Sequence, residues 1–200
     1  MGKFVFNNKE YEYYPNISER AVEIPIAMEY LQRYAEDDIL EVGNVLFFWK
    51  SEYFIGKSKR HIVVDKNEVS GFPEVLNIDI MDYKPDRKFG LIICISTLEH
   101  IGWDCKIRNS PKCYSALLKM ESLLDSGGIL FLTFPVRYNN YLDKIYGDGL
   151  LPLTNSWYMK RISESNDWKQ CAYSDFDDLV FYAYPYSGGN GVVFGEFMNG

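Results

Sequence analysis

The chain has 200 residues, of which 47% are hydrophobic and 24% charged, and these proportions exclude a disordered, collagen-like or disulfide-dense protein. Its 21 Lys and Arg residues face 28 Asp and Glu residues, a formal net charge of -7, which argues against nucleic acid as a partner because phosphate backbones need clustered basic residues. No apolar run approaches the ~18 residues of a membrane helix and no apolar signal segment opens the chain, so we expect no membrane association and a cytoplasmic location.

Helical and strand-like segments alternate along the first two thirds of the chain. An amphipathic helix is predicted over 25–34, with Pro25 tolerated at its start. Short apolar runs then predict strands at 39–42, 61–64, 75–78, 89–95 and 129–134, with a helix over 111–124 before the last of them. This alternation is typical of parallel strands joined by helical crossovers.

The end of the chain has a different pattern. Two strand-like runs, 179–184 and 191–197, flank a segment rich in turn-forming residues at 185–190. Such a pattern predicts an antiparallel hairpin. Without an internal repeat or a linker, the whole chain is expected to form a single domain.

Polar residues follow the predicted strands. Glu41 and Gly43 end the first, Asp65 follows the second, and Asp79 follows the third. In an open α/β sheet, ligands bind beyond the carboxyl ends of the strands, where the strand order reverses. An acid at the position of Asp65 can accept hydrogen bonds from the two hydroxyl groups of a ribose, which predicts a nucleoside site.

Five segments together resemble the class I S-adenosylmethionine-dependent methyltransferases, over about residues 31–136: ILEVGN at 39–44, HIVVDK at 61–66, LNIDIMDY at 76–83, FGLIICISTLEHIG at 89–102 and LLDSGGILFLTFP at 123–135. The resemblance implies an α/β, Rossmann-like fold with a doubly wound, mostly parallel sheet of seven strands that ends in an antiparallel hairpin. It divides the single domain 1–200 into an N-terminal helical cap (1–35), a cofactor-binding core (36–136), and a substrate-side segment with the hairpin (137–200).

The same resemblance implies a site for S-adenosylmethionine formed by residues at the strand ends: Glu41, Gly43, Asn44, Asp65, Lys66, Asp79, Ile80 and Ser96. Glu41 and Gly43 correspond to the motif that lies against the methionine moiety. Asp65 corresponds to the acid that holds the ribose diol, and Asp79 with Ile80 to the pair that meets the adenine edge. No metal is expected, because His100, Asp104, Cys105 and Cys113 lack a recognised ligand spacing.

The first motif departs from the family pattern, which continues as a glycine-rich loop. Here Asn44 and Val45 follow Gly43, so that two glycines are missing. Asn tolerates a left-handed backbone better than most residues, which would allow a tight turn at Asn44. Val45 would crowd the cofactor if it needed a positive φ.

His100 has two interpretations. The resemblance makes it the histidine common among methyltransferases of small molecules, where it would act as a general base. A histidine near a strand end is also often structural, and Glu99 and Asp104 are close enough in sequence to satisfy it. Tyr11, Tyr13 and Tyr14, followed by Arg20 and Glu23, also have two interpretations. They either serve packing or an oligomer contact, or fold over the cleft to bind a substrate or the cofactor carboxylate.

The sequence therefore predicts methyl transfer from S-adenosylmethionine to a small-molecule acceptor, with a sugar or cell-surface glycan precursor as the indicated class. It carries no signal for an oligomeric state. The main alternative is an inactive methyltransferase-like binding or interaction module, motivated by the missing glycines. A nicotinamide-dependent oxidoreductase ranks last, because the G-x-G-x-x-G that places a pyrophosphate at a helix N-terminus is absent from the sequence.

Overall fold

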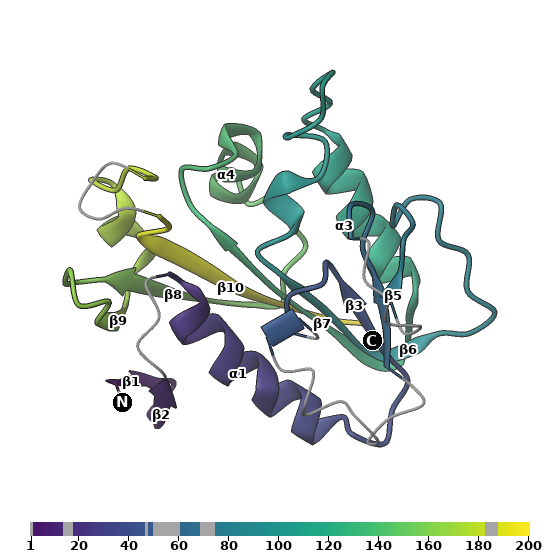
Figure 1. Cartoon of the computed structure of the whole chain (residues 1–200), viewed down its shortest axis with the longest axis horizontal. Helices are drawn as coiled ribbons and strands as arrows, with labels where there is room; N and C mark the ends of the chain where they lie inside the picture. Colours follow the sequence, from purple (N-terminus) through teal and green to yellow (C-terminus); the bar gives the residue numbers. More distant parts are fainter. Residues whose placement is uncertain (1, 14–17, 47, 50–60, 69–74, 183–187) are drawn as a thin grey trace.

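The structure is a computed structural model that describes residues 2–13, 18–46, 48–49, 61–68, 75–182 and 188–200. Helices cover both faces of one large sheet (Figure 1). Helix α1 (Arg20–Arg33) packs on one face, and α3 (Lys112–Ser122) and α4 (Asn140–Gly147) pack on the other. None of the described helices is long and apolar enough to cross a bilayer.

Eight strands form the sheet. In spatial order they are β5 (Val75–Leu76), β4 (His61–Val64), β3 (Ile39–Val42), β6 (Phe89–Ile95), β7 (Leu124–Pro135), β10 (Gly191–Met198), β8 (Asn155–Arg161) and β9 (Trp168–Cys171). The first five are parallel, whereas β10, β8 and β9 each pair antiparallel to the preceding strand. The strand order reverses between β3 and β6, so a ligand site is expected beyond their carboxyl ends.

The central strands are buried on both faces, which explains their continuous apolar runs. Successive side chains of a strand point to opposite sides of the sheet. Accordingly, Leu40 and Ile92 pack toward α3, while Ile39, Leu91 and Ile93 pack toward α1. The α/β, doubly wound and mostly parallel fold class predicted from the sequence is therefore confirmed.

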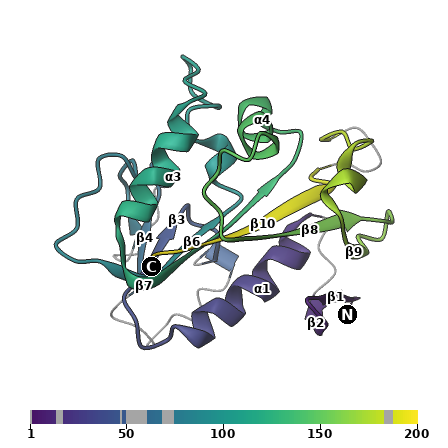
Figure 2. The same ribbon diagram turned by 180° about the vertical axis from the view of Figure 1, so that it is seen from behind.

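Residues 2–13, which were expected to belong to a helical cap, form a β-hairpin of β1 (Gly2–Phe6) and β2 (Lys9–Tyr13). Asn7 and Asn8 make its turn with φ values of 49° and 62°, a conformation that Asn tolerates. The hairpin lies beside β9 (Figure 2), where Asn7 and Gln170 exchange two hydrogen bonds of 2.9 and 3.0 Å. It thus extends the layer formed by α1.

Two expected elements have different limits, and the number of strands also differs. The third strand is confined to Val75–Leu76 rather than extending to residue 78. Helix α1 begins at Arg20, so Pro25 lies inside the helix instead of at its start. The sheet has eight strands instead of seven, because β9 adds an edge strand.

The expected hairpin of 179–184 with 191–197 is wrong in its first strand. Val180 forms an isolated bridge and residues 181–182 form a turn, while 183–187 lie outside the described residues. Leu179 is buried after the 3-10 turn η2 (Tyr173–Phe176), with its amide bonded to Phe176. A turn thus buries this apolar residue without strand pairing, and β10 pairs with β7 and β8 instead.

Candidate functional site

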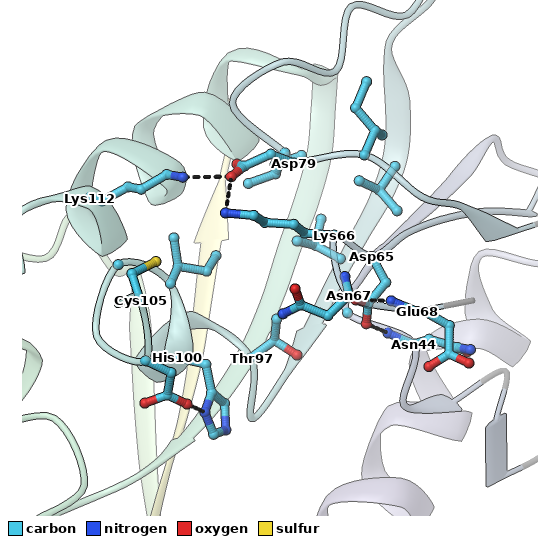
Figure 3. Close-up of a pocket in the computed structure, with 18 of the residues that line it drawn as sticks. Asn44, Asp65, Lys66, Asn67, Glu68, Asp79, Thr97, His100, Cys105 and Lys112 are labelled. Atoms are coloured by element: carbon cyan, nitrogen blue, oxygen red, sulfur yellow. Dashed lines mark hydrogen bonds and ion pairs between the residues drawn. The ribbon is translucent and has the colours of Figure 1, made fainter. Parts of the chain in front are cut away.

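A pocket of about 620 Å³ lies at the carboxyl ends of β3, β4 and β6 (Figure 3). Its volume is in the range of small-molecule sites. All but one of the predicted site residues line it: Gly43, Asn44, Asp65, Lys66, Asp79, Ile80, Ser96 and His100. The exception is Glu41, which is fully buried. The strand order thus brings together residues that lie far apart in the sequence.

The turn after β3 is made by one glycine. Gly43 has a φ of +87°, whereas neither Asn44 nor Val45 has a positive φ. A Cβ on Gly43 would lie 2.0 Å from Oγ1 of Thr97, so a larger residue would collide with the loop after β6. The left-handed residue is therefore Gly43 rather than Asn44, and Val45 lines the pocket without the strain that a positive φ would impose.

Glu41 supports this turn from below the pocket. Its Oε1 accepts hydrogen bonds from the amides of Val45 at 2.8 Å and Leu46 at 2.6 Å. Its Oε2 lies 3.1 Å from Nε2 of His61, which is also buried. A buried carboxylate needs such partners to remain in the fold. Glu41 therefore holds the loop at the pocket instead of lining the pocket itself.

Asp65 connects the loops that follow β3 and β4. Its Oδ2 accepts a hydrogen bond from the amide of Asn44 at 2.9 Å, and its Oδ1 accepts from the amides of Asn67 at 2.8 Å and Glu68 at 3.1 Å. Each carboxylate oxygen carries two lone pairs. Oδ2 therefore retains acceptor capacity at the pocket while the carboxylate holds both loops in place.

Asp79 lies between two lysines that also line the pocket, Lys112 and Lys66 (Figure 3). Its Oδ2 is 2.5 Å from Nζ of Lys112 and 3.4 Å from Nζ of Lys66, and its Oδ1 accepts from the amide of Met81. Burial by itself raises the pKa of Asp79, but the hydrogen bonds from Lys112, Met81 and Lys66 and the charge of Lys112 outweigh it, so the pKa lies below its ordinary value. The carboxylate thus stays ionised. Beside it, Ile80 is buried and supplies an apolar wall.

Ser96 follows β6 with a φ of +35°. It lines the pocket, but its side chain is buried and its hydroxyl donates to Oε1 of Glu23 at 2.6 Å. The hydroxyl of Thr133 donates to the same oxygen at 2.6 Å. Ser96 thus joins the pocket wall to the first turn of α1. Tyr11 and Tyr13 belong to the hairpin core, while Tyr14 lies outside the described residues.

His100 ends the 3-10 turn η1 (Leu98–His100) at the pocket. Its Nδ1 donates to Oδ2 of Asp104 at 2.6 Å, and the hydroxyl of Tyr138 donates to the same oxygen at 2.7 Å. The Tyr138 ring packs against the imidazole with 4.7 Å between centroids. These contacts hold the imidazole in place. The side chain is 46% exposed, so it is still accessible to a ligand.

Four residues of this site were not predicted as contributors from the sequence: Thr97, Asp104, Lys112 and Tyr138. Asp104 was considered as a structural partner of His100 and as a metal ligand, and the metal site was rejected. Lys112 reaches the site from α3, and Tyr138 reaches it from the segment after β7. Each is more than 30 residues away in the sequence from the residue it contacts. No local pattern marks them. Within the described part of the chain, no group of three His, Cys, Asp or Glu residues is arranged to hold a metal.

No protein-family model matches the sequence, and neither does any curated protein. Solved structures do match. The N-methyltransferase NodS from Bradyrhizobium japonicum WM9, in complex with S-adenosyl-L-homocysteine, superposes with a TM-score of 0.51 at 15% identity, over 90% of this chain and 91% of that one. Coclaurine N-methyltransferase, bound to N-methylheliamine and S-adenosylhomocysteine, gives a TM-score of 0.52 at 16% identity, over 93% and 76%. These similarities show that the chain has the class I methyltransferase fold.

Proposed function

We propose that this chain, with its class I methyltransferase fold, transfers a methyl group from S-adenosylmethionine to a small-molecule acceptor. One observation carries the proposal. The pocket lies at the point where the strand order reverses, and the positive-φ Gly43 and the carboxylate of Asp65 meet there. To bind a nucleoside with an attached amino acid, a site needs backbone that the ligand can approach closely and a carboxylate that accepts hydrogen bonds from the ribose diol.

The residues of the pocket fit this cofactor. The backbone at Gly43, which lines the pocket, would lie against the methionine moiety. Oδ2 of Asp65 would accept from the ribose, and Asp79 with Ile80 would border the adenine. Lys66 and Asn44 complete the wall on either side of Asp65. The missing glycines of the first motif do not count against binding, because the positive φ falls on the glycine that remains.

When bound, S-adenosylmethionine supplies a methyl group on a sulfonium, which is already activated for attack. The protein therefore mainly has to orient the acceptor, a contribution that reaches several kcal/mol, about 7–11 in well-aligned systems. His100 would remove a proton from an acceptor hydroxyl or ammonium. With its Nδ1 proton donated to Asp104, the neutral imidazole keeps a lone pair on Nε2, which takes up that proton.

A sugar or a glycan precursor is the acceptor class that we propose. It is supported by the resemblance of the segments EVGNVL at 41–46 and STLEHIGW at 96–103 to methyltransferases of that kind. The acidic composition agrees with a small-molecule acceptor rather than a nucleic acid.

Calorimetric titration with S-adenosylhomocysteine, and in parallel with NAD, tests the cofactor site. We expect saturable binding of S-adenosylhomocysteine only, weakened at least about tenfold in Asp65→Ala. The matched control is Asp125→Ala, which removes a carboxylate from the exposed start of β7. Saturable binding of neither ligand would favour the inactive module, and binding of NAD alone would favour the oxidoreductase.

The role of His100 needs a separate measurement of turnover with an accepted substrate. His100→Ala should lower kcat by about 10²-fold or more while the affinity for S-adenosylhomocysteine stays constant, because general bases contribute about 10²–10⁴-fold. Turnover close to that of the unmodified chain would remove the base role and leave the cofactor site intact.

A further inference from the structure

A second group of ionisable side chains lies at the first turn of α1, behind the pocket-lining residues Ser96 and His100. Three carboxyl groups, those of Glu19, Glu23 and Glu99, surround the single guanidinium of Arg20. Glu23 and Glu99 are buried, and the side chain of Glu19 is 14% exposed. Buried carboxylates are normally matched by an equal number of cations. Here the described side chains supply fewer positive charges than carboxyl groups.

The partners of each carboxyl group show where the imbalance lies. Glu23 is satisfied, because one oxygen accepts from Ser96 and Thr133 and the other pairs with Arg20. Glu99 is not. Its side chain is 1% exposed, its Oε1 lies 3.6 Å from Nε2 of His100, and its Oε2 has no hydrogen-bond partner among the described residues.

The pKa shifts of Glu99 and Glu19 also indicate a shortage of positive charge around them. Burial raises the pKa of Glu99 well above its ordinary value, the charge of Arg20 opposes this shift, and the charges of Glu23 and Glu19 add to it. Burial and the charge of Glu23 also raise the pKa of Glu19. These two groups therefore gain most from an additional positive charge in their vicinity.

Glu99 lies next to residues that line the pocket, so a positively charged group could approach it from there. Thr97 and His100, its near neighbours in the chain, both line the pocket, as does Ser96, which bonds to Glu23. The unpartnered oxygen thus belongs to a turn that contributes His100 to the pocket wall, with Thr97 directly before it. A group bound next to His100 would be adjacent to Glu99.

We propose that Glu99, with Glu19, forms a subsite for the ammonium group of the acceptor, so that the acceptor is an amine. That the bound amine is the methyl acceptor rests on the proposed function. Binding of a cation at this subsite does not depend on it. An ammonium beside the unpartnered Oε2 of Glu99 would favour the ionised form of this carboxyl group, which would release its proton to solvent and accept a hydrogen bond from the ammonium. A neutral alcohol of the same shape brings no positive charge to the carboxylate, so the subsite discriminates between the two.

The test uses matched pairs of probes on the full chain at neutral pH: ethylamine against ethanol, and glucosamine against glucose. Binding is measured by calorimetry, with and without S-adenosylhomocysteine. We expect at least one amine to bind about tenfold or more tightly than its alcohol or sugar counterpart. Equal binding within both pairs, or no binding of either amine, would overturn the subsite.

Variants assign the site. Glu99→Gln keeps the shape of the side chain and should weaken the amine about tenfold or more, while Glu164→Gln, which removes the same charge from an exposed turn, should have no effect. Should Glu99→Gln fail to fold, Glu19→Gln gives the same comparison. An amine that binds equally to the unmodified chain and to the folded variant would refute the assignment.

The same titrations separate this inference from the proposed function. Binding of S-adenosylhomocysteine without preference for an amine would refute the subsite alone. Binding of an amine that depends on Glu99, without binding of S-adenosylhomocysteine, would refute the methyltransferase proposal alone.

Discussion

Gly43 lies directly against Thr97, so that a Cβ on this glycine would come within 2.0 Å of the threonine Oγ1. The contact joins the loop after β3 to the loop after β6, on the two sides of the strand-order reversal. Gly43 also has a φ of +87°. Two independent constraints, backbone conformation and space, therefore require a glycine at this point of the pocket.

Gly43→Ala should abolish measurable binding of S-adenosylhomocysteine and lower the free energy of unfolding by about 1–3 kcal/mol, from strain at a positive φ and from the collision. The control is Gly127→Ala, where φ is +73° but no atom lies within 4 Å of the position that a Cβ would take. It should show the strain alone and leave binding intact. Equal losses of affinity in the two variants would contradict the role of the Thr97 contact.

Glu41 and His61 should stabilise the fold as a pair. Glu41→Ala leaves the amides of Val45 and Leu46 without their acceptor and leaves His61 facing a cavity. We expect a loss of about 3–5 kcal/mol in urea unfolding, the usual result of breaking a buried pair. Glu10→Ala, which removes an exposed carboxylate from the N-terminal hairpin, should change stability by less than about 1 kcal/mol. A similar small change in Glu41→Ala would show that its contacts are dispensable.

The lowered pKa of Asp79 should depend on Lys112. In Lys112→Met the carboxyl group keeps its burial and loses its nearest cation, so its pKa should rise, as followed by a carboxyl NMR titration. Lys119→Met, on the same helix, is the control and should leave the titration of Asp79 unchanged. Because a lowered pKa stabilises the fold above the unfolded value of 3.8, the unmodified chain should lose stability as pH falls below about 4. An unaltered midpoint in Lys112→Met would assign the shift to Lys66 or to the amide of Met81.

Glu99 should make stability depend on pH in the opposite sense. Its raised pKa means that the folded chain holds a proton that the unfolded chain releases near 4.5. The stabilisation is complete below that pH and is lost as pH rises toward the folded value. Burial causes the shift, with Arg20 opposing it and Glu23 and Glu19 adding to it.

Replacement of Glu99 by Gln should therefore flatten the decline of unfolding free energy as pH rises above 4.5, as measured by urea unfolding across a series of pH values. Glu164→Gln should keep the slope of the unmodified chain. Parallel slopes in all three proteins would show that Glu99 is not protonated in the folded state.

Much of the site could be predicted because its main features are local in the sequence. A buried parallel strand gives an apolar run, and the polar residue after it marks the carboxyl edge; Gly43, Asp65 and Asp79 were found in this way, and all three line the pocket. The prediction required only that successive strands be parallel, which the helical crossovers indicate.

Contacts between distant segments could not be predicted. The pairing of β10 with β8 replaced the expected terminal hairpin, because Leu179 could be buried by a turn as well as by a strand. Likewise, Glu41 was predicted to contact the cofactor, but its carboxylate faces His61 and the loop amides. Which partner a side chain meets depends on how layers pack, and a single sequence without covariation carries no direct signal of that.

The sequence by itself determined the parallel core and the edge at which a ligand would bind, because apolar periodicity and strand-end residues are properties of consecutive positions. Only the tertiary structure decided which distant polar side chains meet at that edge: Lys112 with Asp79, and Glu23 with Ser96. Those pairings are separated by as many as 73 residues. They form because α1 and α3 bury opposite faces of the sheet and bring their polar ends to the same pocket.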